Sequence, residues 1–216
     1  MSRVWMALGL LALVLLVIVG VTGHQKNKAV SADSPVTLSE VDENRPELDV
    51  ELLTVNPYSR PGTALEKVNG IVIHYTANPG ATAIANRNYF ENLKDTHTTK
   101  ASSHFVVGLE GEIVQCIPTA EIAYASNDRN SDTISIECCY KNEDGSFEQA
   151  TYDSVIRLTA WLCEKFGLTS EDVIRHYDVT GKLCPLYYVE HEDAWTQFKK
   201  DVDIYLQVYK TGDENG

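Results

Sequence analysis

The sequence predicts an α/β domain with a central mixed β-sheet, preceded by a single N-terminal transmembrane helix. Three observations carry this prediction. Short runs with strand patterns are interspersed with longer segments whose apolar residues recur at helical spacing. Hydrophobic residues make up 44% of the 216 residues, which is enough for one sizeable domain plus accessory segments. An uncharged apolar stretch, residues 4–21, stands apart at the N-terminus.

The apolar stretch is just long enough to span a bilayer at about 1.5 Å per residue. We favour an uncleaved anchor within residues 1–23, because a signal peptide has a shorter apolar region and a nearby small-residue cleavage site. A cleaved signal stays the alternative, with Val30-Ser31-Ala32 as its cleavage site. Basic residues on both sides leave the orientation open by charge. Either interpretation sends the domain across the membrane. We therefore expect a single-pass protein of the cell membrane with an extracytoplasmic domain, or a secreted protein.

Residues 24–56 are polar and acidic and are expected to form a linker, with a short ordered stretch near Val50–Val55. The folded domain is expected over residues 57–210, and residues 211–216 are expected to fray as a disordered tail. The formal net charge is −13, which argues against nucleic acid as a partner, because nucleic-acid binding needs basic patches. We expect a monomer.

The first half of the domain is expected to contain three strands and one helix. Val68–Tyr75 is predicted to be a buried strand, because it is short, β-branched and bounded by glycine and proline. Thr82–Leu93 is predicted to be a helix with a rough apolar face. His104–Gly108 and Glu112–Ile117 resemble two strands joined by a glycine-containing hairpin loop.

The second half adds two strands and two helices, which together make the predicted sheet a mixed one. Thr133–Cys139 alternates and is predicted to be a strand. Thr151–Phe166 is the clearest helix, and a glycine follows it as a stop signal. Val173–Arg175 is predicted to be a short strand that delivers His176, and Glu192–Val208 a final amphipathic helix.

Two histidines and one cysteine are candidate zinc ligands. His74 ends the first predicted strand, and His176 and Cys184 lie close together in a segment with turn signals. Imidazole and thiolate together select zinc, and a catalytic zinc keeps its fourth position open for water. Each histidine alone could equally be a hydrogen-bonded core residue, and the spacing matches neither a CxxC nor an HExxH motif. Together the three residues favour a zinc hydrolase.

Two charged residues are candidates for catalysis. Glu137 lies on a predicted strand with apolar surroundings, where a buried carboxylate must be paired, solvated or functional. A raised pKa would suit it to take a proton from water. Lys182, two residues before Cys184, could stabilise an oxyanion. The alternatives are an outward-facing surface glutamate and a solvated loop lysine. His104 is expected to be a hydrogen-bonded core residue.

The remaining cysteines could form disulfides in an exported protein, but no pairing can be deduced. They are Cys116, Cys138, Cys139 and Cys163.

Four sequence blocks resemble the zinc-dependent N-acetylmuramoyl-L-alanine amidases of the type 2 family, which shares its fold with peptidoglycan recognition proteins and phage lysozyme-type amidases. The blocks are Val72–Thr76, Ser103–Val107, Ile134–Glu137 and His176–Pro185, and the resemblance runs from about Asn56 to Tyr205. It implies helices flanking the central mixed sheet and a zinc site at one end of that sheet.

The resemblance also implies roles for individual residues. By position, His74, His176 and Cys184 match the family's zinc ligands, Glu137 its catalytic carboxylate, and Lys182 the lysine beside the third ligand. The implied reaction is hydrolysis of the peptidoglycan amide that joins the lactyl group of N-acetylmuramic acid to L-alanine, by zinc-activated water.

The chain departs from the family pattern at two positions, and a third position distinguishes two variants of the family. Ser103 stands where some phage members have a catalytic tyrosine, which implies the glutamate-based variant. Ser135 replaces a frequent glycine, and Ala125 replaces a histidine expected to help bind substrate. The alternatives are a non-catalytic peptidoglycan-binding module and a different zinc amidohydrolase or peptidase that acts on stem peptides. A glycosidase is disfavoured because it would need two facing carboxylates.

Overall fold

The computed structural model describes residues 44–212. The predicted membrane anchor, residues 24–43 of the predicted linker and the last four residues of the predicted tail lie outside this range. Between residues 44 and 212, no helix is long and apolar enough to cross a bilayer.

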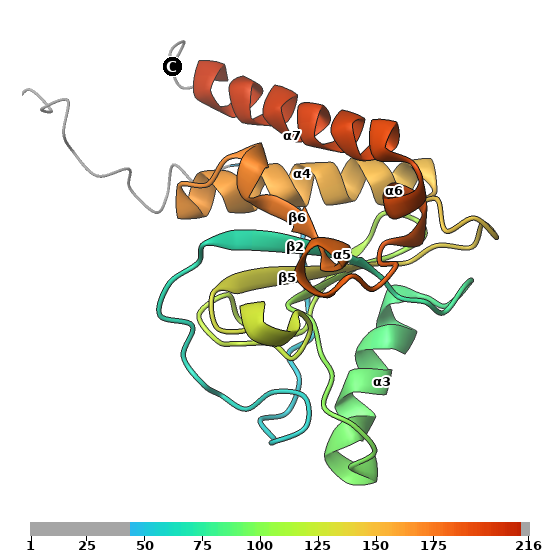
Figure 1. Cartoon of the computed structure of the whole chain (residues 1–216). Helices are drawn as coiled ribbons and strands as arrows, with labels where there is room; N and C mark the ends of the chain where they lie inside the picture. The colour runs from blue at the N-terminus through green and yellow to red at the C-terminus, as the bar shows by residue number, and fades with distance from the viewer. Residues whose placement is uncertain (1–43, 213–216) are drawn as a thin grey trace, which may run out of the picture. The chain divides into compact units, whose positions relative to one another are not determined.

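The described domain is built on a six-stranded mixed sheet, which confirms the predicted fold class (Figure 1). Its strands are β1 (Asp49–Val50), β2 (Gly70–Tyr75), β3 (Phe105–Val107), β4 (Ile113–Gln115), β5 (Thr133–Cys138) and β6 (Val173–Arg175). Their order across the sheet is β1-β4-β3-β5-β2-β6. The pairing of β3 with β4 is antiparallel, as the predicted hairpin requires, and every other neighbouring pair is parallel.

Helices cover both faces of the sheet, as the family resemblance implied. They are α3 (Ala83–Thr96), α4 (Gln149–Phe166), α5 (His176–Thr180), α6 (Leu186–Glu190) and α7 (Glu192–Gly212), with short 3-10 turns η1 (Asn127–Arg129) and η2 (Ser170–Asp172). In Figure 1, α4 and α7 lie side by side over one face and α3 lies below the other. The core divides in the same way, into an α4/α7 cluster and a smaller α3 cluster.

The central strands β2 and β5 place two predicted site residues next to each other. Both strands are buried almost throughout, because they lie inside the sheet between helical layers. Ile73 and Ile136 pack into the α4/α7 cluster, so the next residues, His74 and Glu137, point to the α3 face. The parallel register pairs His74 directly with Glu137. The sheet therefore sets these two side chains beside each other on one face.

The folded domain begins upstream of the predicted boundary at residue 57. Asp49–Val50 pairs with β4 at the sheet edge, and backbone hydrogen bonds to the β4 segment continue through Leu53. Leu53 is 1% exposed and belongs to the α3 cluster. The ordered stretch expected near Val50–Val55 therefore overlaps a segment that pairs with the sheet edge. Edge pairing and one buried leucine order a segment whose composition is that of a linker.

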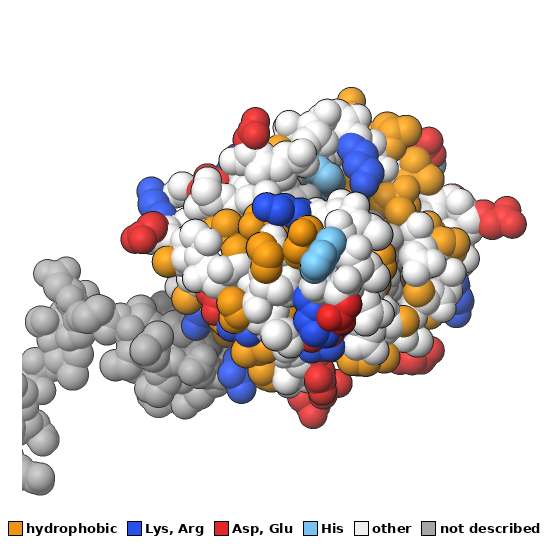
Figure 2. Space-filling view, turned by 90° about the horizontal axis from the view of Figure 1, so that it is seen from below, with side chains coloured by type: hydrophobic (Ala, Val, Ile, Leu, Met, Phe, Trp, Pro, Cys, Tyr) orange, Lys and Arg blue, Asp and Glu red, His pale blue; other side chains and the backbone are white. Residues whose placement is uncertain are grey.

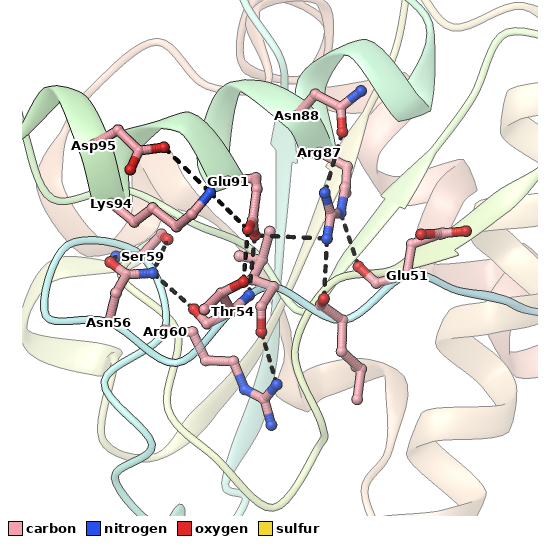
Figure 3. A network of polar contacts seen from close by, with 12 residues as sticks. Glu51, Thr54, Asn56, Ser59, Arg60, Arg87, Asn88, Glu91, Lys94 and Asp95 are labelled. Atoms are coloured by element: carbon pink, nitrogen blue, oxygen red, sulfur yellow. Dashed lines mark hydrogen bonds and ion pairs between the residues drawn. The ribbon is translucent and has the colours of Figure 1, made fainter.

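Side chains of α3 fasten this upstream segment, as Figure 3 shows. Arg87 donates hydrogen bonds to the carbonyl oxygens of Glu51 and Leu52. Glu91 accepts from the backbone N–H and the hydroxyl of Thr54, at 3.0 and 2.7 Å, and forms an ion pair with Lys94. The network replaces water as the partner of otherwise unpaired backbone groups.

Glu91 should make the stability of this domain acid-sensitive. Partial burial by itself raises the pKa of Glu91, but hydrogen bonds from Thr54 and Lys94 outweigh it and lower the pKa to about 2. A depressed folded-state pKa stabilises the fold above the unfolded-state pKa of about 4.3. That contribution disappears as the pH falls towards 2. We expect Glu91→Gln to lower the free energy of unfolding by about 1 kcal/mol at pH 7, after allowance for solvent screening.

Denaturant unfolding at pH 7 and at about pH 3 would measure this effect. The difference between wild type and Glu91→Gln should shrink at the lower pH. Asp95→Asn, at the exposed end of the same network, is the control and should change little at either pH. An equal difference at both pH values would contradict the prediction.

Candidate metal centre and cleft

The three predicted metal ligands meet at one end of the sheet. His74 lies on β2, and His176 begins α5 directly after β6, the strand that pairs with β2. Cys184 follows α5 in the chain. All three are buried, and their ligand atoms lie within 4.8 Å of one another. The cluster therefore has the size and the donor set that a zinc ion needs.

A short closed loop brings Cys184 back to His176. The N–H of Tyr177 donates to the carbonyl oxygen of Cys184 at 3.0 Å, and that of Gly181 donates to Tyr177 at 2.7 Å. Gly181 ends α5 with a φ of +76°, a left-handed conformation that glycine adopts without strain. The turn signals of this segment thus serve to return the chain to the cluster.

The two histidines contact polar side chains through the same ring nitrogen, Nε2. Nδ1 of His74 lies 3.8 Å from Sγ of Cys184, while its Nε2 lies 3.2 Å from Oγ of Ser126. Nε2 of His176 lies 3.1 Å from Oδ1 of Asn127. Nδ1 of His176 is buried and has no hydrogen-bond partner. A buried unpartnered nitrogen is costly, and a metal ion would satisfy it.

The protonation behaviour of the three ligands also fits a metal ion. Burial, followed by the charge of neighbouring cationic groups, lowers the pKa of both His74 and His176, so the rings are held in the neutral form that binds metals. Burial raises the pKa of the Cys184 thiol to about 12. A bound divalent cation would supply the charge that allows the thiol to ionise.

Glu137 is the predicted carboxylate of the cleft. It is half-buried, and its Oε2 atom is buried without a hydrogen-bond partner. Burial raises its pKa to about 8, and the charge of Lys182 opposes this rise only in part. Glu137 thus lines the cleft rather than the outer surface of the sheet.

One cleft of about 360 Å³ joins all five predicted residues. Lys182 reaches this cleft from the loop after α5 and is itself exposed. The other lining residues are Tyr75, Phe90, Lys100, Ala101, Ser102, Tyr124, Ala125, Asn127 and Asn130. Ala125 thus lines the cleft, at the position where the family pattern has a histidine expected to help bind substrate. The sequence alone does not reveal Ser126 and Asn127, because no local pattern marks a residue that contacts a histidine ring far away in the chain.

Outside the cleft, His104 and Ser135 belong to one buried hydrogen-bond network. His104 is a satisfied core histidine, with Nδ1 3.0 Å from Oγ of Ser135 and Nε2 2.9 Å from the carbonyl oxygen of Glu121. The hydroxyl of Ser135, at the position of a frequent glycine, therefore contributes to a buried network. All five cysteines are buried and free, so the structure contains no disulfide among them.

Figure 2 shows the face of the molecule that lies below in Figure 1, on the side of α3. On this face, basic and acidic side chains are interspersed with apolar ones. No broad basic patch covers this face.

The mixed sheet and its cleft, with two histidines, a cysteine and an unpaired glutamate, have the layout of a metal-dependent hydrolase. Comparison with known proteins identifies the family. The family model for N-acetylmuramoyl-L-alanine amidases matches residues 64–186. The chain belongs to this family, as the four sequence blocks indicated.

Named relatives agree with this assignment. The chain is 39% identical over 165 residues to the N-acetylmuramoyl-L-alanine amidase CwlL of Bacillus licheniformis, with 70% of this chain and 45% of that protein covered. It is 36% identical over 171 residues to the amidase BlyA of Bacillus subtilis (strain 168), with 69% and 45% covered. The chain thus spans about half the length of these relatives.

Solved structures show the same fold. The catalytic domain of XlyA matches with a TM-score of 0.61 and 29% identity, covering 73% of this chain and 99% of that one. A mutant endolysin from Bacillus subtilis matches with a TM-score of 0.60 and 30% identity, covering 72% and 98%. The matched region is therefore a whole catalytic domain in the XlyA structure.

Proposed function

We propose that this protein is a zinc-dependent peptidoglycan amidase that hydrolyses the bond between the lactyl group of N-acetylmuramic acid and L-alanine of the stem peptide. The observation that carries the proposal is the convergence of His74, His176 and Cys184 beside Glu137 in one cleft. Membership of the amidase family supports the choice of substrate.

The donor set supports zinc as the cofactor. His74 and His176 would hold the zinc ion through Nδ1, and Cys184 would hold it through Sγ. Nδ1 of His74 lies 3.8 Å from Sγ of Cys184, and Nδ1 of His176 is buried without a hydrogen-bond partner. When bound, zinc would polarise the scissile carbonyl group and lower the pKa of water from about 15.7 towards 7.

Glu137 and Lys182 would handle protons and charge. The unpaired Oε2 of Glu137 would accept the proton of the attacking water and pass it to the leaving amine. Lys182, at the same cleft, would stabilise the negative charge that develops on the carbonyl oxygen. The narrow cleft would hold the amide between these two groups.

Replacing Cys184 with serine should weaken zinc binding. A hydroxyl is a much poorer zinc ligand than a thiolate, so the loss should exceed the roughly 10–100-fold typical of changes outside the ligand set. Zinc content after dialysis, measured by mass spectrometry, would report it. Cys139→Ser is the matched control, because this thiol is buried in the α3 cluster away from the cleft. An unchanged zinc content in Cys184→Ser would remove this residue from the ligand set.

Product analysis tests the activity itself. The full chain in mild detergent would be incubated with purified peptidoglycan, with and without a zinc chelator. Release of stem peptides with a free L-alanine amino terminus from intact glycan, stopped by the chelator and restored by zinc, is expected. Cleavage inside the stem peptide would identify a different peptidase, and new reducing ends would identify a glycosidase.

A second candidate is a non-catalytic peptidoglycan-binding module. Ala125 favours it, because this cleft residue lacks a side chain that could hold substrate. Retention of zinc and of peptidoglycan binding without any cleavage would establish the module and overturn the amidase.

We also propose that residues 4–21 anchor the protein as a single-pass helix, with the domain on the extracytoplasmic side and acting as a monomer. The length and the lack of charge of this stretch support the anchor, and the position of the wall substrate supports the orientation. Fractionation and the intact mass of the native protein would test it. A soluble product that lacks the stretch would show secretion after cleavage, and sedimentation in detergent would report the oligomeric state.

A further inference from the structure

Two consecutive residues hold the two histidines of the cluster by the same ring atom. Oγ of Ser126 lies 3.2 Å from Nε2 of His74, and Oδ1 of Asn127 lies 3.1 Å from Nε2 of His176. Ser126 precedes the 3-10 turn η1 and Asn127 begins it. One short turn therefore contacts both rings on the side away from Cys184.

These contacts decide which nitrogen of each ring is free. An amide oxygen only accepts hydrogen bonds, so its position at Nε2 of His176 selects the tautomer with the proton on that atom. The lone pair then lies on Nδ1, which is buried without a partner. The Ser126 hydroxyl can accept from Nε2 of His74 in the same way, which leaves Nδ1 of His74 towards the Cys184 sulfur.

The turn is held in place by contacts of its own. The Oδ1 atom of Asn130 accepts from the N–H groups of Ala125 and Ser126, at 3.0 and 2.6 Å. The N–H groups of Arg129 and Asn130 donate to the carbonyl oxygens of Ser126 and Asn127. Asn127 has a φ of +51°, a left-handed conformation that asparagine tolerates better than most residues. The turn is therefore held by hydrogen bonds within its own segment.

We propose that Ser126 and Asn127 are positioning residues that fix both histidine rings with Nδ1 facing the metal. This inference rests on the proposed zinc site and adds the residues that organise it. Outer residues of this kind typically change metal affinity by about 10–100-fold when removed. The turn also lies at the cleft, next to Ala125. The segment in which Ala125 replaces the family histidine therefore also contacts the two histidine ligands.

Matched substitutions separate the hydrogen bond from the backbone. Asn127→Gly removes the amide and suits a positive φ, so it adds no strain. Asn127→Asp keeps an acceptor at the same place. Ser126→Ala removes the hydroxyl and Ser126→Thr retains it. Ser131→Ala, at an exposed position after the turn, is the control.

Two readouts are needed. Competition of the full-length protein with a chromophoric chelator gives the dissociation constant for Zn²⁺. Nitrogen-15 NMR of the metal-free protein reports which nitrogen of each ring carries the proton. We expect Asn127→Gly and Ser126→Ala each to weaken Zn²⁺ binding by about 10–100-fold. Asn127→Gly should also mix the tautomers of His176. Asn127→Asp, Ser126→Thr and Ser131→Ala should stay near wild type.

The outcomes distinguish this inference from the proposed function. Wild-type affinity and an unchanged tautomer in both Asn127→Gly and Ser126→Ala would overturn the positioning role, with the zinc site intact. Loss of affinity in Asn127→Asp as well as in Asn127→Gly would also overturn it, because the acceptor would then be irrelevant. A wild-type protein that binds no Zn²⁺ would overturn the proposed function, and this inference with it.

Discussion

Glu137→Ala is expected to abolish amide hydrolysis while the protein still binds zinc. The carboxylate lies beside His74 in the strand register but is not one of the three clustered ligands. Its removal takes away the group that would move the proton from water to the leaving amine, a contribution of about 10²–10⁴-fold. Initial rates on purified peptidoglycan, together with zinc content, would measure both properties in the same preparation.

The same substitution should not destabilise the fold. Oε2 of Glu137 is buried without a hydrogen-bond partner, and such a group costs free energy. Thermal unfolding of metal-free Glu137→Ala should therefore occur at or above the wild-type temperature. Glu143→Ala, at an exposed position after β5, is the control and should keep full activity. Full activity of Glu137→Ala would exclude this residue from the mechanism.

Arg175→Met is expected to produce the largest loss of stability. Arg175 is 6% exposed, and its guanidinium donates to both carboxylate oxygens of Asp178, to Glu192 and to the carbonyl oxygen of Tyr188. It also lies over the ring of Trp195. Removing it would leave the Asp178 carboxylate with the backbone N–H of residue 175 as a donor and would take the guanidinium donor from the carbonyl oxygen of Tyr188, at a cost of about 1–3 kcal/mol.

The loss should reach the metal centre, because Arg175 directly precedes His176 and ties the start of α5 to α6 and α7. We expect Arg175→Met to weaken zinc binding as well as to lower the free energy of unfolding in denaturant. Arg157→Met, on α4, is the matched control. Arg157 is exposed and donates to the hydroxyl of Ser154 at 3.4 Å, so its replacement should cost less than about 1 kcal/mol. Equal losses in the two variants would contradict a special role for Arg175.

The local sequence was sufficient to predict the long helices and strands of this domain. The β-branched run of β2 and the periodic apolar residues of α4 predict their structure, since each pattern repeats with the period of its element. A glycine after α4 adopts a left-handed conformation and ends that helix, as predicted. These signals lie within a few residues of the structure that they specify.

The elements that the sequence did not predict depend on distant partners. Asp49–Val50 is a strand only because β4 offers a free edge, since its own side chains are exposed. The helices α5 and α6 are too short to be stable alone, and they form where Arg175 joins them. No local pattern could distinguish such segments from loop.

For the candidate site, the sequence by itself determined the chemical identity of the groups: two imidazoles, a thiol, a carboxylate and an ammonium in blocks typical of a zinc amidase. Only the tertiary structure decided which atoms face one another. The parallel register places His74 beside Glu137, and a turn 52 and 49 residues from the two histidines holds their Nε2 atoms. The sequence specifies which side chains are present, but the direction of each side chain depends on neighbours that are distant in the sequence and close in the folded structure.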